Sequence, residues 1–119
     1  QKFKPKCIYT TPRHDLNSDH QRVFDSTLVA TRPGTSSVET IFSYELAGFV
    51  KTPFNPNTFE NIEEELPQKL EALKEYKSEI MKYPHPRSLE SIKNLAIYRG
   101  IQSGLKQAEA FELIHKIIS

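Results

Sequence analysis

Two histidines and two aspartates fall within seven residues near the N-terminus, in the stretch RHDLNSDHQRVF that covers residues 13–24. These four are His14, Asp15, Asp19 and His20. Imidazole nitrogens and carboxylate oxygens are ligands of zinc, and both groups also transfer protons in acid–base catalysis. The stretch therefore has two interpretations: it is part of a metal site, or it is a polar loop that caps an ordinary helix.

The metal interpretation gives each polar side chain a role. His20 would ligate zinc if two more ligands converged from other loops, because a catalytic zinc usually has three protein ligands. Asp15 and Asp19 would orient the imidazole or move protons, and Asn17 would donate a hydrogen bond to a carbonyl oxygen. His14 and His20 are a weaker pair of ligands, since the fold would have to bring a loop residue round.

The capping interpretation explains the same residues without a metal. Ser18 and Gln21 have the spacing of a capping box, in which the Ser18 hydroxyl accepts from the Gln21 amide and the Gln21 side chain returns to the Ser18 amide. Aspartate and asparagine before a helix also favour capping. The residues by themselves leave both interpretations open.

A strand and a helix must position these residues, and the hydrophobic pattern predicts both. KCIYT, residues 6–10, predicts a buried strand, and a helix is expected over residues 18–30. Residues 38–46 predict a second strand and residues 58–62 a short third one. The order of strand, helix and strand favours a parallel pair with a right-handed crossover. Residues 13–20 would then lie at the carboxyl end of a strand, where α/β sheets bind ligands.

Three helices are expected in the rest of the chain. Their ranges are 63–83, 88–99 and 107–118, with Phe111, Ile114 and Ile117 on the buried face of the last one. Other predicted core residues are Cys7, Val23, Phe24, Thr27, Leu28, Thr31, Val38, Ile41, Phe42, Leu66, Leu70, Leu73, Lys77, Ile80, Ile92, Leu95 and Ala96. We expect an α/β fold of about three short strands followed by these three helices. So thin a parallel sheet suggests that more of the sheet exists elsewhere.

Composition narrows the class of protein. The chain has 119 residues, which suits one domain, and its net charge of +1 lacks the basic excess of a nucleic-acid-binding protein. No apolar run reaches the length of a transmembrane helix. The single cysteine, Cys7, excludes an internal disulfide framework and favours a reducing compartment, for which the cytoplasm is the expectation.

Other features are open to a functional and a structural interpretation. The loop from Phe49 to Phe54 is either a platform for a sugar or a contact between subunits. His85 and Arg87 lie either at the rim of a site or in a rigid turn between helices. Gly100 and Gly104 are expected to end a helix, since no strand precedes them as a phosphate-binding loop requires.

The sequence resembles the LmbE-like, or PIG-L, family of zinc-dependent N-deacetylases. The matching segments, in order from Ile8 to Leu113, are IYT, DLNSDHQ, YEL, FNPNTFENI, KLEALKEYKSE and PHPRSLESIKNLAIYRGIQSGLKQAEAFEL. The resemblance covers only the C-terminal half of the family domain. It implies that residues 1–119 form a single partial domain, the C-terminal portion of a Rossmann-like parallel-sheet fold. The His-Pro-Asp-Asp motif of the N-terminal half, which supplies two zinc ligands and a catalytic aspartate, is absent from this sequence.

The resemblance implies hydrolysis of the N-acetyl group of an amino sugar, with zinc as the cofactor. His20 matches the third zinc ligand and Asp19 the acidic residue beside it. Asn17 stands where many relatives have a histidine that stabilises the oxyanion or protonates the leaving amine, and Asp15 lies in the same loop. The chain would need the missing half or a companion segment, and would be inactive alone. Relatives also imply a homo-oligomer.

A second hypothesis belongs to another class of protein. The chain would be a non-catalytic α/β module, used for assembly or for ligand binding, and its polar loop would only cap a helix. The absent His-Pro-Asp-Asp motif favours this hypothesis for the chain taken alone. Loss of zinc binding on a change of His20 to alanine would separate the two.

Overall fold

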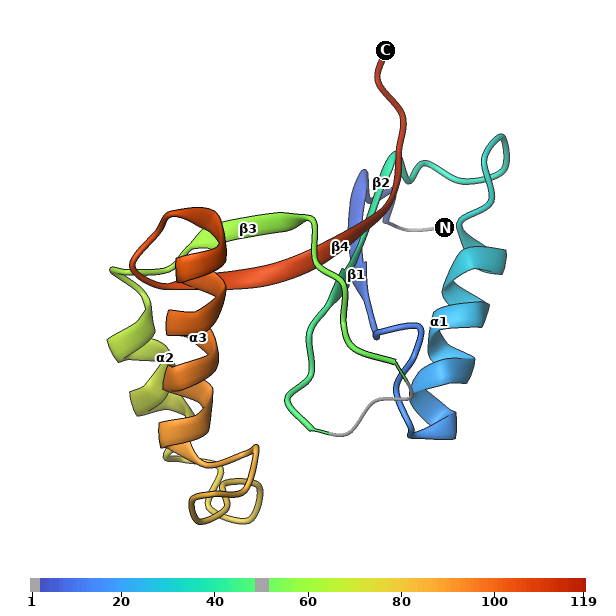
Figure 1. Ribbon diagram of the computed structural model, residues 1–119. Coiled ribbons are helices and arrows are strands. Elements are labelled where there is room, and N and C mark those ends of the chain that lie inside the picture. Colours follow the sequence, from blue (N-terminus) through green and yellow to red (C-terminus); the bar gives the residue numbers. More distant parts are fainter. Residues whose placement is uncertain (1–2, 49–51) are drawn as a thin grey trace. The chain divides into compact units, whose positions relative to one another are not determined.

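A computed structural model describes residues 3–48 and 52–119 as an α/β fold (Figure 1). Its elements, in chain order, are β1 (Cys7–Thr10), α1 (Ser18–Ala30), β2 (Thr40–Tyr44), β3 (Thr58–Asn61), α2 (Leu66–Leu73), α3 (Leu89–Ser103) and β4 (Ala108–Lys116). The four strands form one sheet with the order β1-β2-β4-β3. No helix within the described ranges is long and apolar enough to cross a membrane.

The sheet is mixed rather than wholly parallel. β1 and β2 are parallel, in register from the pair Cys7 and Thr40 to the pair Thr10 and Ser43. This confirms the predicted parallel pair on either side of a helix. β4 is antiparallel to β2, and the register of this pair shifts between Ile41 and Phe42 of β2. The expectation of a purely parallel sheet is therefore wrong. The strand beside β2 is β4, which is distant from β2 in the sequence and runs antiparallel to it.

The predicted helix over residues 107–118 is wrong, because this segment forms β4. The spacing of Phe111, Ile114 and Ile117 suits a helix, but Ala108 and Ala110 are the buried positions, with 2% and 4% of their surface exposed. Buried residues two apart indicate a strand with one face in the core. Backbone hydrogen bonds to neighbouring segments override the weak helical pattern.

Two other helices differ from the prediction in length. α2 ends at Leu73 instead of reaching residue 83, because the amides of Glu75 and Tyr76 donate to carbonyls three residues back and form turns. Lys77, which was expected on the buried face, is exposed. α3 continues past the predicted end at residue 99 to Ser103, where Gly104, with φ of 74°, takes the left-handed conformation that ends a helix.

The chain divides into two compact units, and each has its own apolar core. One comprises Gln1–Thr58 and Phe111–Ser119, and the other comprises Phe59–Ala110. In the first unit Phe24, Val38 and Ile41 are buried, as predicted. In the second, the core cluster is Ile62, Leu66 and Ala96, with Leu70 packed against it.

Three predicted core residues of the first unit are more exposed than expected. Val23 is 48% exposed, and Cys7, which was expected to be inert in the core, is exposed. Phe42 is half-buried, and its ring lies 5.4 Å from that of Tyr9 and 6.0 Å from that of Phe111, measured between centroids. These three aromatic residues form a cluster on one face of the sheet, with Tyr9 55% exposed.

We expect Gly100→Ala to destabilise the fold. A Cβ atom there would lie 2.6 Å from the backbone oxygen of Leu105 and 2.7 Å from the carbonyl carbon of Lys106. Alanine favours a helix by about 1 kcal/mol over glycine, but overpacking against rigid backbone costs about 1–3 kcal/mol. Urea denaturation should show a lower midpoint, with exposed Lys93→Ala on the same helix as a nearly neutral control. A midpoint equal to or above wild type would contradict the close packing.

Candidate functional site

The loop between β1 and α1 is fixed to both neighbouring elements. The Ser43 hydroxyl, fully buried on β2, donates to the backbone oxygen of Thr11 at 2.9 Å. The Thr11 hydroxyl donates to the backbone oxygen of His20 at 2.7 Å, and the Thr10 hydroxyl lies 3.0 Å from that of Thr27 on α1. These bonds hold the carboxyl end of β1 against the first turns of the helix, which is where the sequence placed the polar stretch.

Asn17, rather than Ser18, caps α1. Its side-chain oxygen accepts from the backbone amides of Asp19, at 2.8 Å, and His20, at 3.4 Å. The Gln21 backbone amide donates to the backbone oxygen of Asn17 at 3.1 Å, and the N-cap is Asn17, so the predicted capping box with Ser18 as the cap is wrong. The Gln21 side-chain nitrogen donates to the backbone oxygen of Asp15. The helix itself begins at Ser18 as expected, because asparagine satisfies the same free amides as serine would.

Asp15 and His20 form a carboxylate–imidazole pair in which the carboxylate is buried. Asp15 Oδ2 lies 3.1 Å from His20 Nδ1, and Asp15 Oδ1 accepts from the backbone amide of Asn17 at 2.8 Å. Asp15 is 8% exposed, so these contacts replace the water that an exposed carboxylate would bind. A carboxylate at Nδ1 favours the tautomer with the proton on that nitrogen, which leaves the lone pair of Nε2 for a metal.

The His20 ring is accessible to a ligand from outside the chain. Its side chain is 37% exposed, and no hydrogen bond to Nε2 comes from the residues that the structure describes. A histidine whose Nδ1 is held by a carboxylate and whose Nε2 is open has the arrangement of a metal-ligating histidine. This is what the stretch can do chemically besides capping the helix.

Asp19 does not join this arrangement. Its side chain is 82% exposed and lies 3.8 Å from Arg22 Nη1, one turn along the helix. The structure therefore brings Asp15, Asn17 and His20 together and directs the Asp19 carboxylate to solvent. An acidic residue in the first turn still interacts favourably with the N-terminus of the helix.

His85 and Arg87 belong to the second compact unit. His85 Nδ1 accepts from the backbone amide of Arg87 at 3.1 Å, and Arg87 Nη1 lies 3.2 Å from Glu79 Oε2. These contacts stabilise the turn that precedes α3, which agrees with the structural interpretation of these residues. Across residues 3–48 and 52–119, no group of three or more histidine, cysteine, aspartate or glutamate side chains is placed to hold a metal ion.

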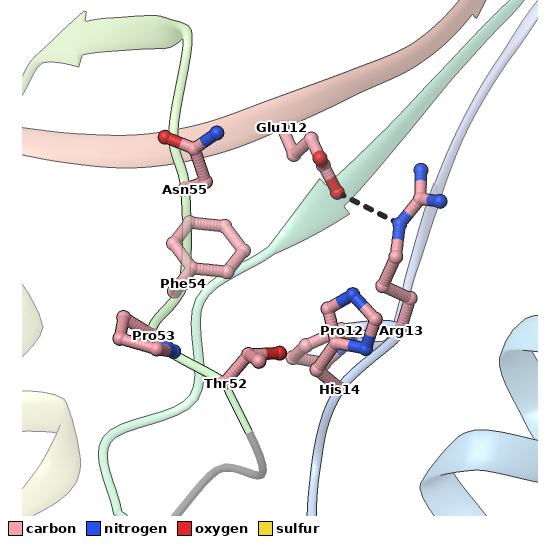
Figure 2. Close-up of a pocket in the computed structure, with 8 residues that line it drawn as sticks. All are labelled: Pro12, Arg13, His14, Thr52, Pro53, Phe54, Asn55 and Glu112. Atoms are coloured by element: carbon pink, nitrogen blue, oxygen red, sulfur yellow. Dashed lines mark hydrogen bonds and ion pairs between the residues drawn. The ribbon is translucent and has the colours of Figure 1, made fainter.

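A pocket of about 330 Å³ lies beside the residues that precede Asp15 (Figure 2). It is lined by Pro12, Arg13, His14, Thr52, Pro53, Phe54, Asn55 and Glu112. The sequence predicted either a platform for a sugar or a subunit contact for the loop that ends at Phe54, and Phe49 lies outside the described residues. The prediction missed Glu112 because it assigned this residue to a helix, where no signal would direct it toward the loop after β1.

Arg13 links the pocket to the rest of its unit. Its Nε lies 3.3 Å from Glu112 Oε1, and its guanidinium carbon lies 5.3 Å from the centroid of the Phe24 ring. The second contact is a cation–π interaction with a buried residue of α1. The loop, the helix and β4 therefore all position this side chain.

Comparison with known proteins identifies a similar fold. No protein-family model matches the chain, and no curated protein matches it. Among solved structures, the conserved protein TT1542 from Thermus thermophilus is similar, with a TM-score of 0.73 and 20% sequence identity. The match covers 98% of this chain and 55% of that protein, so the chain spans about half of the length of its structural neighbour. At this identity the likeness shows the fold alone.

We expect Asn17→Ala to destabilise α1 more than Ser18→Ala. Loss of an N-cap side chain costs about 0.5–2 kcal/mol, while Ser18, whose side chain is not the cap, should change stability by less than about 0.5 kcal/mol. Urea denaturation monitored by circular dichroism would measure both. A larger effect of Ser18→Ala would restore the capping box as the true cap.

A second prediction concerns the tautomer of His20. At a pH where the imidazole is neutral, ¹⁵N NMR should show the proton on Nδ1 in the wild type, because Asp15 accepts from that nitrogen. Asp15→Ala should shift the ¹⁵N signals of His20 toward a mixture of tautomers, while Asp19→Ala should leave them unchanged. A wild-type ring protonated on Nε2 would show that the pair does not prepare a metal ligand.

Proposed function

We propose that this chain is the distal half of a zinc-dependent N-deacetylase of the LmbE-like type, which removes the N-acetyl group from an amino sugar. The observation that carries the proposal is the contact between Asp15 Oδ2 and His20 Nδ1, which holds a partly exposed imidazole by one of its two nitrogens. Capping alone would need Asn17 but not an imidazole held by a buried carboxylate.

The fold supports this proposal in its coarse features. The class is α/β, the pair lies after the carboxyl end of a strand in a parallel pair, and the structural neighbour is nearly twice as long. We propose that the chain corresponds to the C-terminal portion of a Rossmann-like domain. A companion segment would supply the remaining sheet and the two zinc ligands of a His-Pro-Asp-Asp motif.

His20 Nε2 would be the ligand that this chain gives to zinc. When bound, zinc would polarise the acetyl carbonyl and acidify a water molecule. Asp15 holds the tautomer and the orientation of the imidazole through Nδ1, which makes it a positioning residue. The Asn17 side chain would donate a hydrogen bond to the oxyanion, because its oxygen is used by the helix cap and its amide nitrogen is the remaining donor. Asp19 would act on a proton only if its exposed side chain turned.

The proposal implies several partners. They are an N-acetylated amino-sugar substrate, the companion segment and further copies of the assembled protein as a homo-oligomer. A cytoplasmic location would fit a thiol that remains reduced, since Cys7 is exposed. The chain by itself would bind zinc weakly, because it supplies one ligand of three, and it would not release acetate.

Titration of the 119-residue chain with Zn²⁺ tests the metal role of His20. We expect the ring signals of His20 to respond first in NMR spectra, with weak affinity, and His20→Ala to remove the response. His85→Ala is the matched control, because His85 is engaged in a turn of the other compact unit. Tight stoichiometric binding by the chain alone would show that the ligand count is wrong, and an unresponsive His20 would refute its metal role.

Acetate release tests the enzymatic part of the proposal. The chain would be mixed with a polypeptide that carries the His-Pro-Asp-Asp half of a family member, zinc and an N-acetylated amino sugar. We expect acetate only from the mixture, and a loss of at least about 100-fold with His20→Ala, in line with removal of a group that organises the reacting centre. Activity that is unaffected by His20→Ala would favour the non-catalytic module.

A further inference from the structure

We propose that Thr11 and Ser43 are positioning residues for the imidazole of His20. Two buried hydroxyl groups in series connect the centre of the sheet to the first turn of α1. The Ser43 hydroxyl donates to the backbone oxygen of Thr11, and the Thr11 hydroxyl donates to the backbone oxygen of His20. The metal role of the ring rests on the proposed function, whereas its positioning can be measured without metal.

The series of hydroxyl groups begins on the central strand of its compact unit. β2 lies between β1 and β4, and Ser43 is in register with Thr10 on one side and with Glu112 on the other. The Ser43 side chain is fully buried, so water does not compete for its bond of 2.9 Å to the Thr11 oxygen. Thr11 therefore takes its position from a rigid element of the sheet.

The Thr11 hydroxyl closes the loop between β1 and α1 at its base. It reaches the backbone oxygen of His20, nine residues further along the chain, at 2.7 Å, and Thr11 is only 6% exposed. A helical carbonyl has two lone pairs, so it can accept this hydroxyl as well as the amide four residues later. A closed loop has fewer conformations, and Asp15 lies within this one.

His20 thus has separate supports for its backbone and for its ring. Thr11 holds the backbone oxygen, and Asp15 Oδ2 lies 3.1 Å from the ring nitrogen Nδ1. The ring turns about two side-chain dihedral angles, so the carboxylate meets Nδ1 only when the Cα atom of His20 is correctly placed. Loss of the Thr11 bond should therefore weaken the contact between Asp15 and the ring, although Thr11 touches neither group.

Attachment of the helix to the sheet does not by itself require the Thr11 hydroxyl. The Thr10 hydroxyl already joins β1 to the middle of α1, where it lies 3.0 Å from the hydroxyl of Thr27. Valine has nearly the shape of threonine and would fill the buried position of Thr11 without a polar group that needs a partner. Of the two threonines, Thr11 is the one whose bond reaches the residue that carries the candidate ligand.

The test is ¹⁵N NMR of the His20 ring in the metal-free 119-residue chain, at a pH where the imidazole is neutral. Asp15→Ala defines the full shift toward a mixture of tautomers. We expect Thr11→Val to move the His20 signals in the same direction, because the ring loses part of its contact with Asp15. Thr11→Ser should restore the wild-type signals, since serine retains the hydroxyl. An unchanged ring in Thr11→Val would overturn the proposal.

Thr31→Val is the matched control for a general loosening of α1. The Thr31 hydroxyl donates to the backbone oxygen of Thr27 at 2.7 Å, so this variant loses the same kind of bond at the other end of the helix. We expect a lower midpoint of urea denaturation and unchanged His20 signals. A shift of the ring signals as large as that of Thr11→Val would show that any weakening of the helix moves the ring, and would overturn the proposal.

Ser43→Ala keeps the proposal testable if Thr11→Val does not fold. It should shift the His20 signals in the same direction by a smaller amount, and an unchanged ring would exclude Ser43 from the positioning role. In the mixture with the His-Pro-Asp-Asp polypeptide, Thr11→Val should weaken zinc binding about tenfold, as loss of a group that supports a ligand does. Zinc affinity equal to wild type would overturn the link to the metal. Because the ring signals are recorded without zinc, their failure is distinct from a failure of the metal role of His20.

Discussion

The buried carboxylate of Asp15 is the group on which the candidate site depends. A charge with 8% exposure is tolerated only when hydrogen bonds replace its water, and Asp15 obtains them from the Asn17 amide and from His20 Nδ1. The first contact fixes the residue that caps α1, and the second fixes the ring of the candidate ligand. The helix cap and the candidate ligand therefore share one support, so the two interpretations of the polar stretch are not exclusive.

The local part of this arrangement could be predicted from the sequence, and the long-range part could not. β1, α1 and β2 follow from patterns within a few residues, and so does the position of the polar stretch between them. The sequence predicted Ser18 as the helix cap, whereas Asn17 is the cap in the structure. Both side chains can accept from the free amides of a helix, and the path of the loop determines which of them is in position. The sequence also predicted that Asp15 and Asp19 would orient the His20 imidazole, and the contact of Asp15 with Nδ1 confirms this for Asp15, while Asp19 lies at the surface.

β4 shows why the remainder could not be predicted. Its apolar residues fit a helix and a strand about equally, and the choice is made by partners far away in the sequence, β2 and Asn57. Because the segment was assigned to a helix, Glu112 was not recognised as a residue that lines the pocket. The second pocket-lining segment, residues 52–55, has no regular structure and therefore no periodic signal. The candidate metal ligand His20 could thus be found from the sequence, but most of the residues that line the pocket could not.

β1 lies at the end of the strand order, so one of its edges pairs with no strand among the described residues. Its flank also presents Tyr9, 55% exposed and stacked on Phe42, and the free thiol of Cys7. An open edge beside exposed aromatic surface is a template for strand addition by another polypeptide. At high concentration, copies of the purified chain would pair with one another along this edge. The solubility of the chain would therefore depend on a segment that covers β1. Purification with reducing agent and at low protein concentration follows directly from the position of this one strand.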